Sequence, residues 1–260
     1  MANFFKNIFS KNTKLNTDQL IQKKTILSFF FFFVFGFSAF LGWQWLRQQP
    51  TTSGKTSTPI RKVLNTNEAV FNRLLSDKNL TKEYPLSLAA NPARVNGNLG
   101  LKTKFDPTTW SMNVIKAKGD TLKIKLEDIK KLPKMEIVFN FKCIEGWSQI
   151  THWGGVRFSE FMNRYGLNEE AAMEYLGLAT PDKEYYVGID MRSAMHPQTL
   201  LCYELNGKPL PLDQGYPLRL IIPVKYGVKS LKRIGDMYFS NKRPPDYWAD
   251  VKGYDYFSGL

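Results

Sequence analysis

The longest apolar stretch of the chain lies near its N-terminus. Residues 25–46 carry no charge and include five consecutive phenylalanines at 29–33. At about 1.5 Å per residue, a helix of this length spans the roughly 30 Å hydrocarbon core of a bilayer. Trp43 and Trp45 stand at one end, where aromatic rings favour the headgroup level. The pattern predicts a transmembrane helix at 25–46, preceded by a basic N-terminal tail at 1–24.

The residues that flank the apolar stretch indicate its orientation. Five lysines precede it, which favours the N-terminus inside the cell and the rest of the chain outside: Lys6, Lys11, Lys14, Lys23 and Lys24. A Ser/Thr/Gly/Pro stretch follows and predicts a flexible linker at 47–62, with a folded domain at 63–260. We expect a single-pass protein of the inner membrane whose domain lies on the periplasmic side. The alternative is a cleaved signal peptide.

Short apolar patterns predict the helices and strands of the rest of the chain. Val70, Phe71, Leu74 and Leu75 share one helical face, which predicts a helix at 67–78. Alternating or apolar runs bounded by turn residues predict strands at 110–115, 122–126, 137–141, 185–189, 200–205, 218–224 and 234–239. Short helices fit at 126–131, 158–165 and 169–177, and Asn206-Gly207 is typical of a tight hairpin turn. Because helices and strands do not alternate regularly, the fold class is predicted to be α+β.

Composition and charge exclude several classes of protein. A hydrophobic content of 43% supports a packed core, and two cysteines are too few for a disulfide-stapled miniprotein or a four-thiolate metal site. Of the net charge of +13, residues 1–62 contribute +8, from nine basic side chains and one acid. The domain itself carries 27 basic and 22 acidic residues, and no nucleic-acid recognition module is visible. We therefore expect no nucleic acid as a partner.

The cysteines and histidines leave several chemistries open. Cys143 follows a predicted strand and begins a Gly-containing turn, where a thiolate can face a ligand and Lys142 would lower its pKa. A buried, inert thiol is the alternative, and it is favoured for Cys202 among apolar neighbours. A disulfide between the two is a further alternative. His152 and His196 are isolated, which gives a zinc hydrolase little support and leaves a Cys-His hydrolase open.

The segment 219–233 is basic and free of acids. Arg219, Lys225, Lys229, Lys232 and Arg233 lie within it, and a glycine at 227 introduces a bend. Such a segment can direct ammonium groups and backbone N–H groups at a phosphate. A solvated basic face or a contact with anionic lipid is the alternative.

Four stretches in order resemble one family. They read KCIEGWSQITHWGGVRFSEF, MHPQTLLCYELNGKPLP, DQGYPLRLIIPVKYGVKSLKRIG and RPPDYWADVKGYDYFSGL. Residues 85–260 thereby resemble the sulfite-oxidase-like molybdopterin-dependent oxidoreductases, nearest the bacterial catalytic subunits related to the periplasmic methionine sulfoxide reductase. The resemblance implies a molybdopterin-binding domain of mixed sheets with short helices. It also implies a molybdenum–molybdopterin cofactor and two-electron oxygen-atom transfer on a sulfite, sulfoxide or related small oxo substrate.

The resemblance also implies roles for individual residues. Cys143 matches the cysteinyl ligand of molybdenum, which a soft thiolate suits. Glu145 matches an acidic position of the sulfoxide-reductase branch and could relay protons, with a purely structural role as the alternative. The positions that match cofactor-binding residues are Arg94, Asn96, Thr180, Gln214, Arg219, Ser230, Leu231 and Lys232. Gln214 departs from the His or Asn common in relatives but keeps a hydrogen-bond donor and an acceptor.

The resemblance also bears on the redox partner of the chain, on the side of the membrane that its domain faces and on alternative functions. The sequence holds no haem-attachment motif, so a separate redox partner is implied, for which a membrane b-type cytochrome is a candidate. Exported relatives use the twin-arginine route, whereas Lys23-Lys24 precedes the span here, so a domain facing the cytoplasm is an alternative. Two functional alternatives are an anchored binding module that keeps the fold without the metal and a cysteine hydrolase.

Overall fold

The computed structural model describes residues 16–76 and 78–260, which form two compact units. Lys6, Lys11 and Lys14 of the predicted tail lie outside the described residues. The first unit contains α2, Thr17–Gln48, a single helix in which no residue is buried. It is longer than the predicted 25–46 at both ends. Asn16 begins it as an N-cap that accepts the N–H of Gln19 at 2.9 Å.

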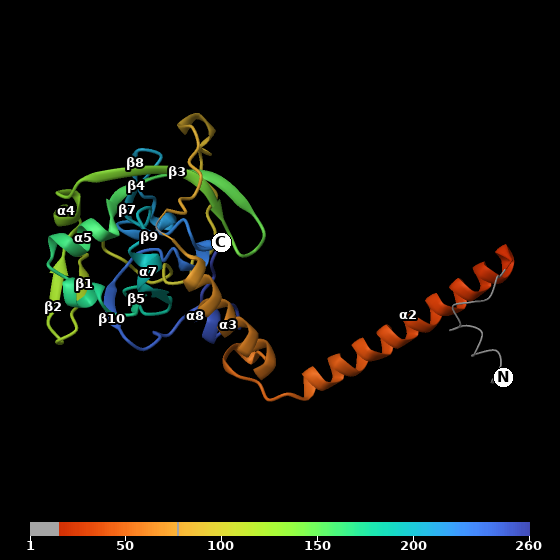
Figure 1. The fold of residues 1–260 in the computed structure, drawn as a ribbon. Helices are drawn as coiled ribbons and strands as arrows, with labels where there is room; N and C mark the ends of the chain where they lie inside the picture. The colour runs from red at the N-terminus through yellow and green to blue at the C-terminus, as the bar shows by residue number, and fades with distance from the viewer. Residues whose placement is uncertain (1–15, 77) are drawn as a thin grey trace. The chain divides into compact units, whose positions relative to one another are not determined.

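The second unit is the folded domain, whose α+β class is as predicted (Figure 1). Its helices are α3 Thr58–Leu74, α4 Leu126–Lys130, α5 Phe158–Arg164, α6 Asn168–Ala171, α7 Met191–Ala194 and α8 Tyr247–Asp250, with single 3-10 turns η1 Ser53–Lys55, η2 Leu86–Leu88, η3 Leu212–Gln214 and η4 Gly227–Lys229. Its strands are β1 Met112–Ile115, β2 Thr121–Ile124, β3 Lys134–Lys142, β4 Ser148–Arg157, β5 Tyr175–Ala179, β6 Tyr186–Asp190, β7 Leu200–Leu205, β8 Lys208–Pro209, β9 Arg219–Ile221 and β10 Asp236–Ser240. All seven predicted strands are present; β7 has the predicted bounds, and the other six have shifted ends.

The domain is built on two five-stranded sheets. The first has the order β2-β1-β10-β5-β6, in which only β1 and β10 run parallel. The second has the order β3-β4-β7-β8, with β9 paired to β7. The hairpin between β7 and β8 turns at Asn206-Gly207, where both residues have positive φ, as the dipeptide predicts.

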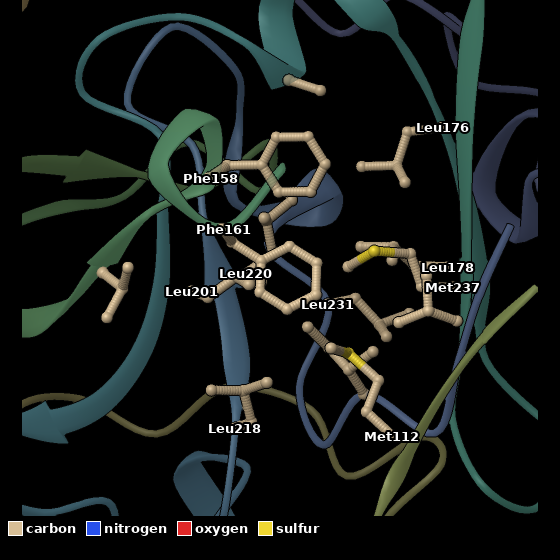
Figure 2. Close-up of a cluster of buried hydrophobic side chains, with 14 of the residues drawn as sticks. Met112, Phe158, Phe161, Leu176, Leu178, Leu201, Leu218, Leu220, Leu231 and Met237 are labelled. Carbon is tan, nitrogen blue, oxygen red and sulfur yellow. The ribbon is translucent and has the colours of Figure 1, made fainter. Parts of the chain in front are cut away.

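Strands β7 and β9 of the second sheet are buried on both faces. Leu201 and Leu220 point into the main core, where they meet helix α5 and the first sheet (Figure 2). Leu200, Cys202 and Ile221, on the opposite face, join Phe139 in a second cluster. Because successive side chains of a strand point to opposite faces, a double-sided burial explains the continuous apolar run at 200–205.

Three predictions of local structure were wrong or incomplete. The helix predicted at 67–78 is α3, which begins at Thr58, so the predicted linker 47–62 includes the end of α2 and the start of α3. The helix predicted at 169–177 ends at Ala171 and gives way to β5. β4 was not predicted, because Gly154 and Gly155 read as a break. An added Cβ at Gly155 would lie 2.2 Å from the Leu201 carbonyl oxygen, so this glycine permits the close approach of β7.

Candidate active site

Cys143 lies in the turn that joins β3 to β4. Its N–H bonds the carbonyl of Trp147 at 2.9 Å, and its own carbonyl accepts the N–H of Gly146 at 3.1 Å. Gly146 has φ of 91°, a conformation that favours glycine, which explains the Gly in the sequence EGW. The thiol is 7% exposed and receives a hydrogen bond from Asn96 Nδ2 at 3.6 Å. The turn therefore fixes a buried thiol at the end of a strand.

The thiol faces a cavity of about 190 Å³. Cavity walls come from segments far apart in the chain: the loop at 94–99, the β3–β4 turn, η3, β9, η4 and α8. Eight of the ten residues predicted for the site line it: Arg94, Asn96, Cys143, Glu145, Gln214, Arg219, Ser230 and Lys232. The structure thus brings together most of the residues that the resemblance singled out.

Thr180 and Leu231 do not line the cavity. The Thr180 hydroxyl donates to Asp182 at 2.6 Å, and its side chain packs beneath the backbone of Gly100. Leu231 is fully buried in the main core. Both support neighbouring parts of the wall, since Thr180 also bonds the backbone of Tyr185 and Ser230 precedes Leu231.

Three cations line the cavity: the exposed Arg94, and Arg219 and Lys232, which are more deeply placed. Arg219 is 3% exposed; its guanidinium donates to the carbonyl and the Oε1 of Gln214, both at 3.0 Å, and lies 4.6 Å over the ring of Trp153. Lys232 Nζ donates to the carbonyls of Asn96, Gly97 and Asp213 at 2.7–3.0 Å. Burial lowers the pKa of Arg219 to about 10 and that of Lys232 to about 7. Neither forms a salt bridge with a carboxylate among the described residues.

Two buried polar atoms of the wall also lack partners. Arg219 Nε and Ser230 Oγ have no hydrogen-bond partner within the described part of the chain. Buried polar groups in proteins are almost always satisfied, so two orphan donors beside two uncompensated cations mark a place for an anion. The wall therefore fits a phosphate, and the nearby thiol fits a soft metal.

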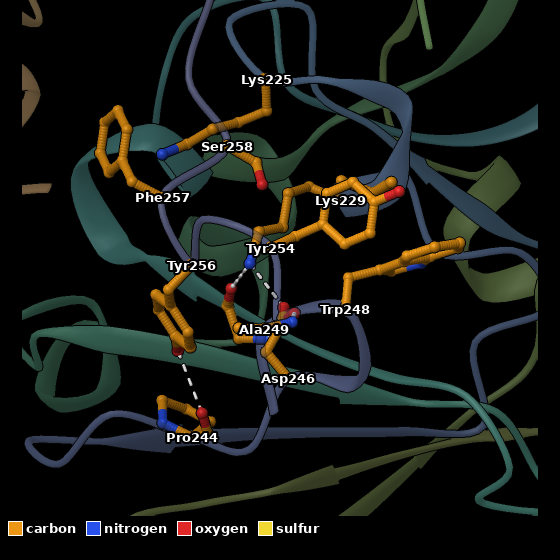
Figure 3. Close-up of polar contacts among 12 residues, drawn as sticks. Lys225, Lys229, Pro244, Asp246, Trp248, Ala249, Tyr254, Tyr256, Phe257 and Ser258 are labelled. Carbon is orange, nitrogen blue, oxygen red and sulfur yellow. Dashed lines mark hydrogen bonds and ion pairs between the residues drawn. The ribbon is translucent and has the colours of Figure 1, made fainter. Parts of the chain in front are cut away.

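The remaining cations of the basic segment serve the fold. Lys225 Nζ lies 2.6 Å from Asp190 Oδ1 and over the ring of Phe257, and Lys229 Nζ lies 2.5 Å from Asp246 Oδ2 (Figure 3). Both lysines are buried. A solvated basic face, the alternative for this segment, is excluded, and only part of the segment can hold an anion.

For the thiol, one expectation is corrected and one alternative is excluded. Burial is the largest influence on Cys143 and raises its pKa, whereas Lys142 was expected to lower it. Lys142 precedes Cys143 on β3, is exposed and lines a different cavity. A disulfide is also excluded, because Cys143 and Cys202 are both free.

Neither histidine can act as a base for Cys143. His152 Nε2 pairs with Glu136 at 3.1 Å, and neither His152 nor His196 lines the cavity. His152 lies between Thr151 and Trp153, which do line it, so its side chain points to the other face of β4. The Cys-His hydrolase alternative therefore lacks its second residue.

Sequence reasoning missed the aromatic wall of the cavity. Tyr185 Oη donates to the carbonyl of Val228 at 2.5 Å and accepts from Trp248 Nε1 at 3.0 Å. Both residues line the cavity, as do three further aromatic side chains: Phe141, Trp147 and Trp153. Trp248 lies in the terminal stretch that carried the resemblance, but no local pattern distinguishes it from an aromatic residue of the core.

The fold and the cavity together define a class of protein. A thiol at a strand end and an anion-binding wall in a two-sheet α+β domain are what a sulfite-oxidase-like cofactor domain requires. The structure is similar to the sulfane dehydrogenase SoxCD from Paracoccus pantotrophus, with a TM-score of 0.50 at 16% identity over 56% of this chain and 42% of that chain, which supports the fold.

Sequence comparison gives the family. Residues 98–248 match the description "Oxidoreductase molybdopterin binding domain", and the chain belongs to that family. It is an enzyme of the sulfite oxidase and sulfoxide reductase type, as the resemblance predicted.

The chain is also similar to individual relatives whose names refer to protein-methionine-sulfoxide reductases. YedZ1 of Azospira oryzae, whose name provisionally assigns it as a subunit of a protein-methionine-sulfoxide reductase, is 33% identical over 74% of this chain and 73% of its own length. The protein-methionine-sulfoxide reductase catalytic subunit MsrP of Xanthomonas axonopodis is 36% identical over 52% of this chain. The chain spans 46% of that relative and 58% of MsrP from Campylobacter jejuni, which is 28% identical.

Proposed function

We propose that the chain is a membrane-anchored molybdenum enzyme that transfers an oxygen atom and two electrons to or from a sulfite, sulfoxide or related small oxo substrate. The observation that carries the proposal is that the Cys143 thiol, Arg219 and Lys232 line the same cavity. The names of the MsrP relatives favour sulfoxides as the first substrates to test.

Different residues of the cavity would bind different parts of a molybdenum–molybdopterin cofactor. When bound, the cofactor supplies a metal that can exchange one oxygen atom and two electrons. Cys143 Sγ would hold the metal. Arg219 Nε and Ser230 Oγ would donate hydrogen bonds to the pterin phosphate. Lys232, whose three N–H groups already meet carbonyls, would contribute its charge, and the phosphate would supply the negative charge that the two cations lack.

We propose that Glu145 moves protons at the rim of the cavity. Its carboxylate is exposed and accepts hydrogen bonds from Asn96 Nδ2 at 3.1 Å and Trp147 Nε1 at 3.3 Å. Reduction of a sulfoxide to a sulfide consumes two protons and two electrons and releases one water molecule. A carboxyl group two residues from the metal-binding thiol, in contact with solvent, can deliver those protons.

Helix α2 supports the anchoring part of the proposal. Its 32 residues exceed the length that a bilayer core requires, and its composition is apolar enough to cross it. We propose that α2 stays attached as a single transmembrane helix and that the domain lies on the periplasmic side of the inner membrane. Electrons would come from a separate redox partner, with a membrane b-type cytochrome as the candidate.

Replacement of the thiol tests the proposal. We expect Cys143→Ser to lower sulfoxide reductase or sulfite oxidase activity by about 100-fold or more, because the hydroxyl is a poor ligand for a soft metal site. Cys202→Ser is the matched control: Cys202 is equally buried but lies in the second core cluster, away from the cavity. Activity is measured against sulfite and a panel of S-oxides and N-oxides after expression with molybdate.

Metal analysis distinguishes the proposed enzyme from a binding module without the metal. Stoichiometric molybdenum and pterin in the unsubstituted chain, together with the loss of activity, support the enzyme. A folded chain without molybdenum from a molybdate-supplied host would instead support a binding module that keeps the fold. A fully active Cys143→Ser variant would refute the assigned role of the thiol.

A further inference from the structure

Helix α3 is fixed to the domain by one face. The Glu68 carboxylate forms a salt bridge with Arg243 and accepts the hydroxyl of Tyr175 at 3.1 Å. Phe71 stacks on Phe257, with ring centroids 5.8 Å apart. Near the start of the helix, Arg61 donates to the carbonyl of Ala249 at 3.0 Å. Contacts along its length therefore hold α3 in one orientation on the domain.

The neighbouring face of α3 is apolar and exposed. Ile60, Val63, Val70 and Leu74 recur at spacings of three, seven and four residues, which places them in one stripe along the helix. Their exposed fractions lie between 42% and 65%. We call these four residues the α3 stripe. A continuous apolar strip on a fixed surface helix indicates a contact with another apolar phase or molecule.

The charges beside the stripe distinguish between possible contacts. Lys62 and Arg73 are exposed on the α3 surface that borders it. The one acid of the helix, Glu68, is buried against Arg243 and presents no charge to the outside. Exposed Lys78 and Lys82 follow the helix. Among the described residues of α3, the charges that are exposed are basic, and an apolar strip beside such charges fits the interface of an anionic bilayer better than a protein surface of mixed charge.

The connection to α2 keeps α3 close to the membrane. Nine residues, 49–57, separate the end of α2 at Gln48 from the start of α3 at Thr58. Even fully extended, they reach about 30 Å. If α2 spans the bilayer, as proposed above, the stripe stays within reach of the headgroups of the same membrane.

We infer that the α3 stripe lies in the headgroup region of an anionic bilayer, as a second membrane contact that orients the catalytic domain. This inference rests on the proposed role of α2 as an anchor. The apolar side chains would enter the boundary between headgroups and acyl chains, and Lys62 and Arg73 would pair with lipid phosphates. Because α3 is fixed to the domain, this contact would set the direction in which the cavity faces.

A depth measurement on the full-length, molybdenum-loaded chain tests the inference. A nitrobenzoxadiazole label is placed by Leu74→Cys in the stripe, by Ala69→Cys on the exposed polar side of α3, or by Ser38→Cys within α2. Ala69 is the matched control, since it lies about 140° around the helix from Leu74. The chain is reconstituted in nanodiscs that contain spin-labelled lipid as a quencher. The unsubstituted chain, with Cys143 and Cys202 buried, gives the background labelling.

We expect the label at position 74 to be quenched at least about twofold more than the label at 69. Phosphatidylglycerol should strengthen the quenching at 74, and salt or Lys62→Glu combined with Arg73→Glu should weaken it, because the flanking charges are solvent-exposed. Quenching at 38 should be strong under all these conditions.

The three labels separate the possible failures. Quenching at 38 together with equal, weak quenching at 74 and 69 would overturn the lipid contact and leave the anchor intact. A label at 74 that lipid does not quench but that is shielded from aqueous iodide would assign the stripe to a protein partner or a second copy, and would also overturn the inference. Absence of quenching at 38 would refute the anchor and the lipid contact together.

Discussion

At the scale of single residues, the cations of the basic segment 219–233 fall into two groups according to the atoms they contact. Lys225 and Lys229 meet buried carboxylates, whereas Arg219 and Lys232 meet carbonyl and amide oxygens and an open cavity. A buried cation without a counter-ion is unfavourable, so we expect an anionic ligand to complete the second pair. The sequence could not make this division, because the acids that neutralise Lys225 and Lys229 are Asp190 and Asp246, distant in the chain.

The lowered pKa of Lys232 makes anion binding depend on pH. In the cofactor-free chain Lys232 is charged below its folded pKa of about 7, and a bound anion raises that pKa. We therefore expect the affinity for sulfate, whose charge is constant over this range, to be level below pH 7 and to fall by up to about tenfold per unit above it. Isothermal titration between pH 6 and about 9 checks this.

Lys232→Arg provides the control for the pH dependence. Arginine keeps its charge throughout this range, so the variant should bind sulfate with an affinity that changes little with pH. Lys232→Met should bind weakly at every pH. A decline of the same steepness in Lys232→Arg would assign the pH dependence to another group.

At the scale of elements, the strands that the sequence predicted are those with clear runs of apolar residues, such as β3 and β7. The two longer omissions, β4 and β5, contain glycines that face another part of the sheet. An added Cβ at Gly177 of β5 would lie 2.2 Å from the ring of Tyr238, its partner on β10. Glycine in a strand normally indicates a break, and only the three-dimensional partner shows that it admits a ring or a backbone.

Gly155 of β4 offers a test of this explanation. We expect Gly155→Ala to lower the free energy of unfolding by about 1–3 kcal/mol or more, because the new methyl group would meet the backbone of β7 at Leu201 and Cys202. Urea unfolding followed by near-ultraviolet circular dichroism in one detergent measures the change.

The adjacent glycine is the control for this measurement. At Gly154 an added Cβ would meet Glu204 Oε2 at 3.0 Å, and Glu204 Cβ and Lys134 Cε at 3.2 Å each. All three are side-chain atoms at longer distances than the backbone atoms that Gly155 would meet, so Gly154→Ala should cost less. Equal losses in the two variants would show that the close approach of β7 is not the cause.

At the scale of the whole molecule, the candidate active site forms only when the domain is folded. Its wall extends from Arg94 to Trp248, so chain segments separated by most of the domain must meet before the cavity forms. The resemblance predicted most of the polar wall, because those residues lie in recognisable stretches. It did not predict the aromatic wall, which depends on how distant elements pack. The spacing of the α3 stripe is visible in the sequence, but only the packing of α3 on the domain shows that the stripe stays exposed.

The charges that flank α2 bear on the side of the membrane that we propose for the domain. Five lysines in residues 1–24 stand against four basic residues in 47–62, a small difference that favours the N-terminus inside and the domain outside. We expect protease added to intact spheroplasts to digest the domain while a cytoplasmic marker stays whole. Because the difference is small, Lys23→Glu combined with Lys24→Glu should increase the protected fraction, and Lys55→Glu on the other side should not. Protection of the unsubstituted domain until lysis would place it in the cytoplasm, where the cofactor could be inserted without any need for export.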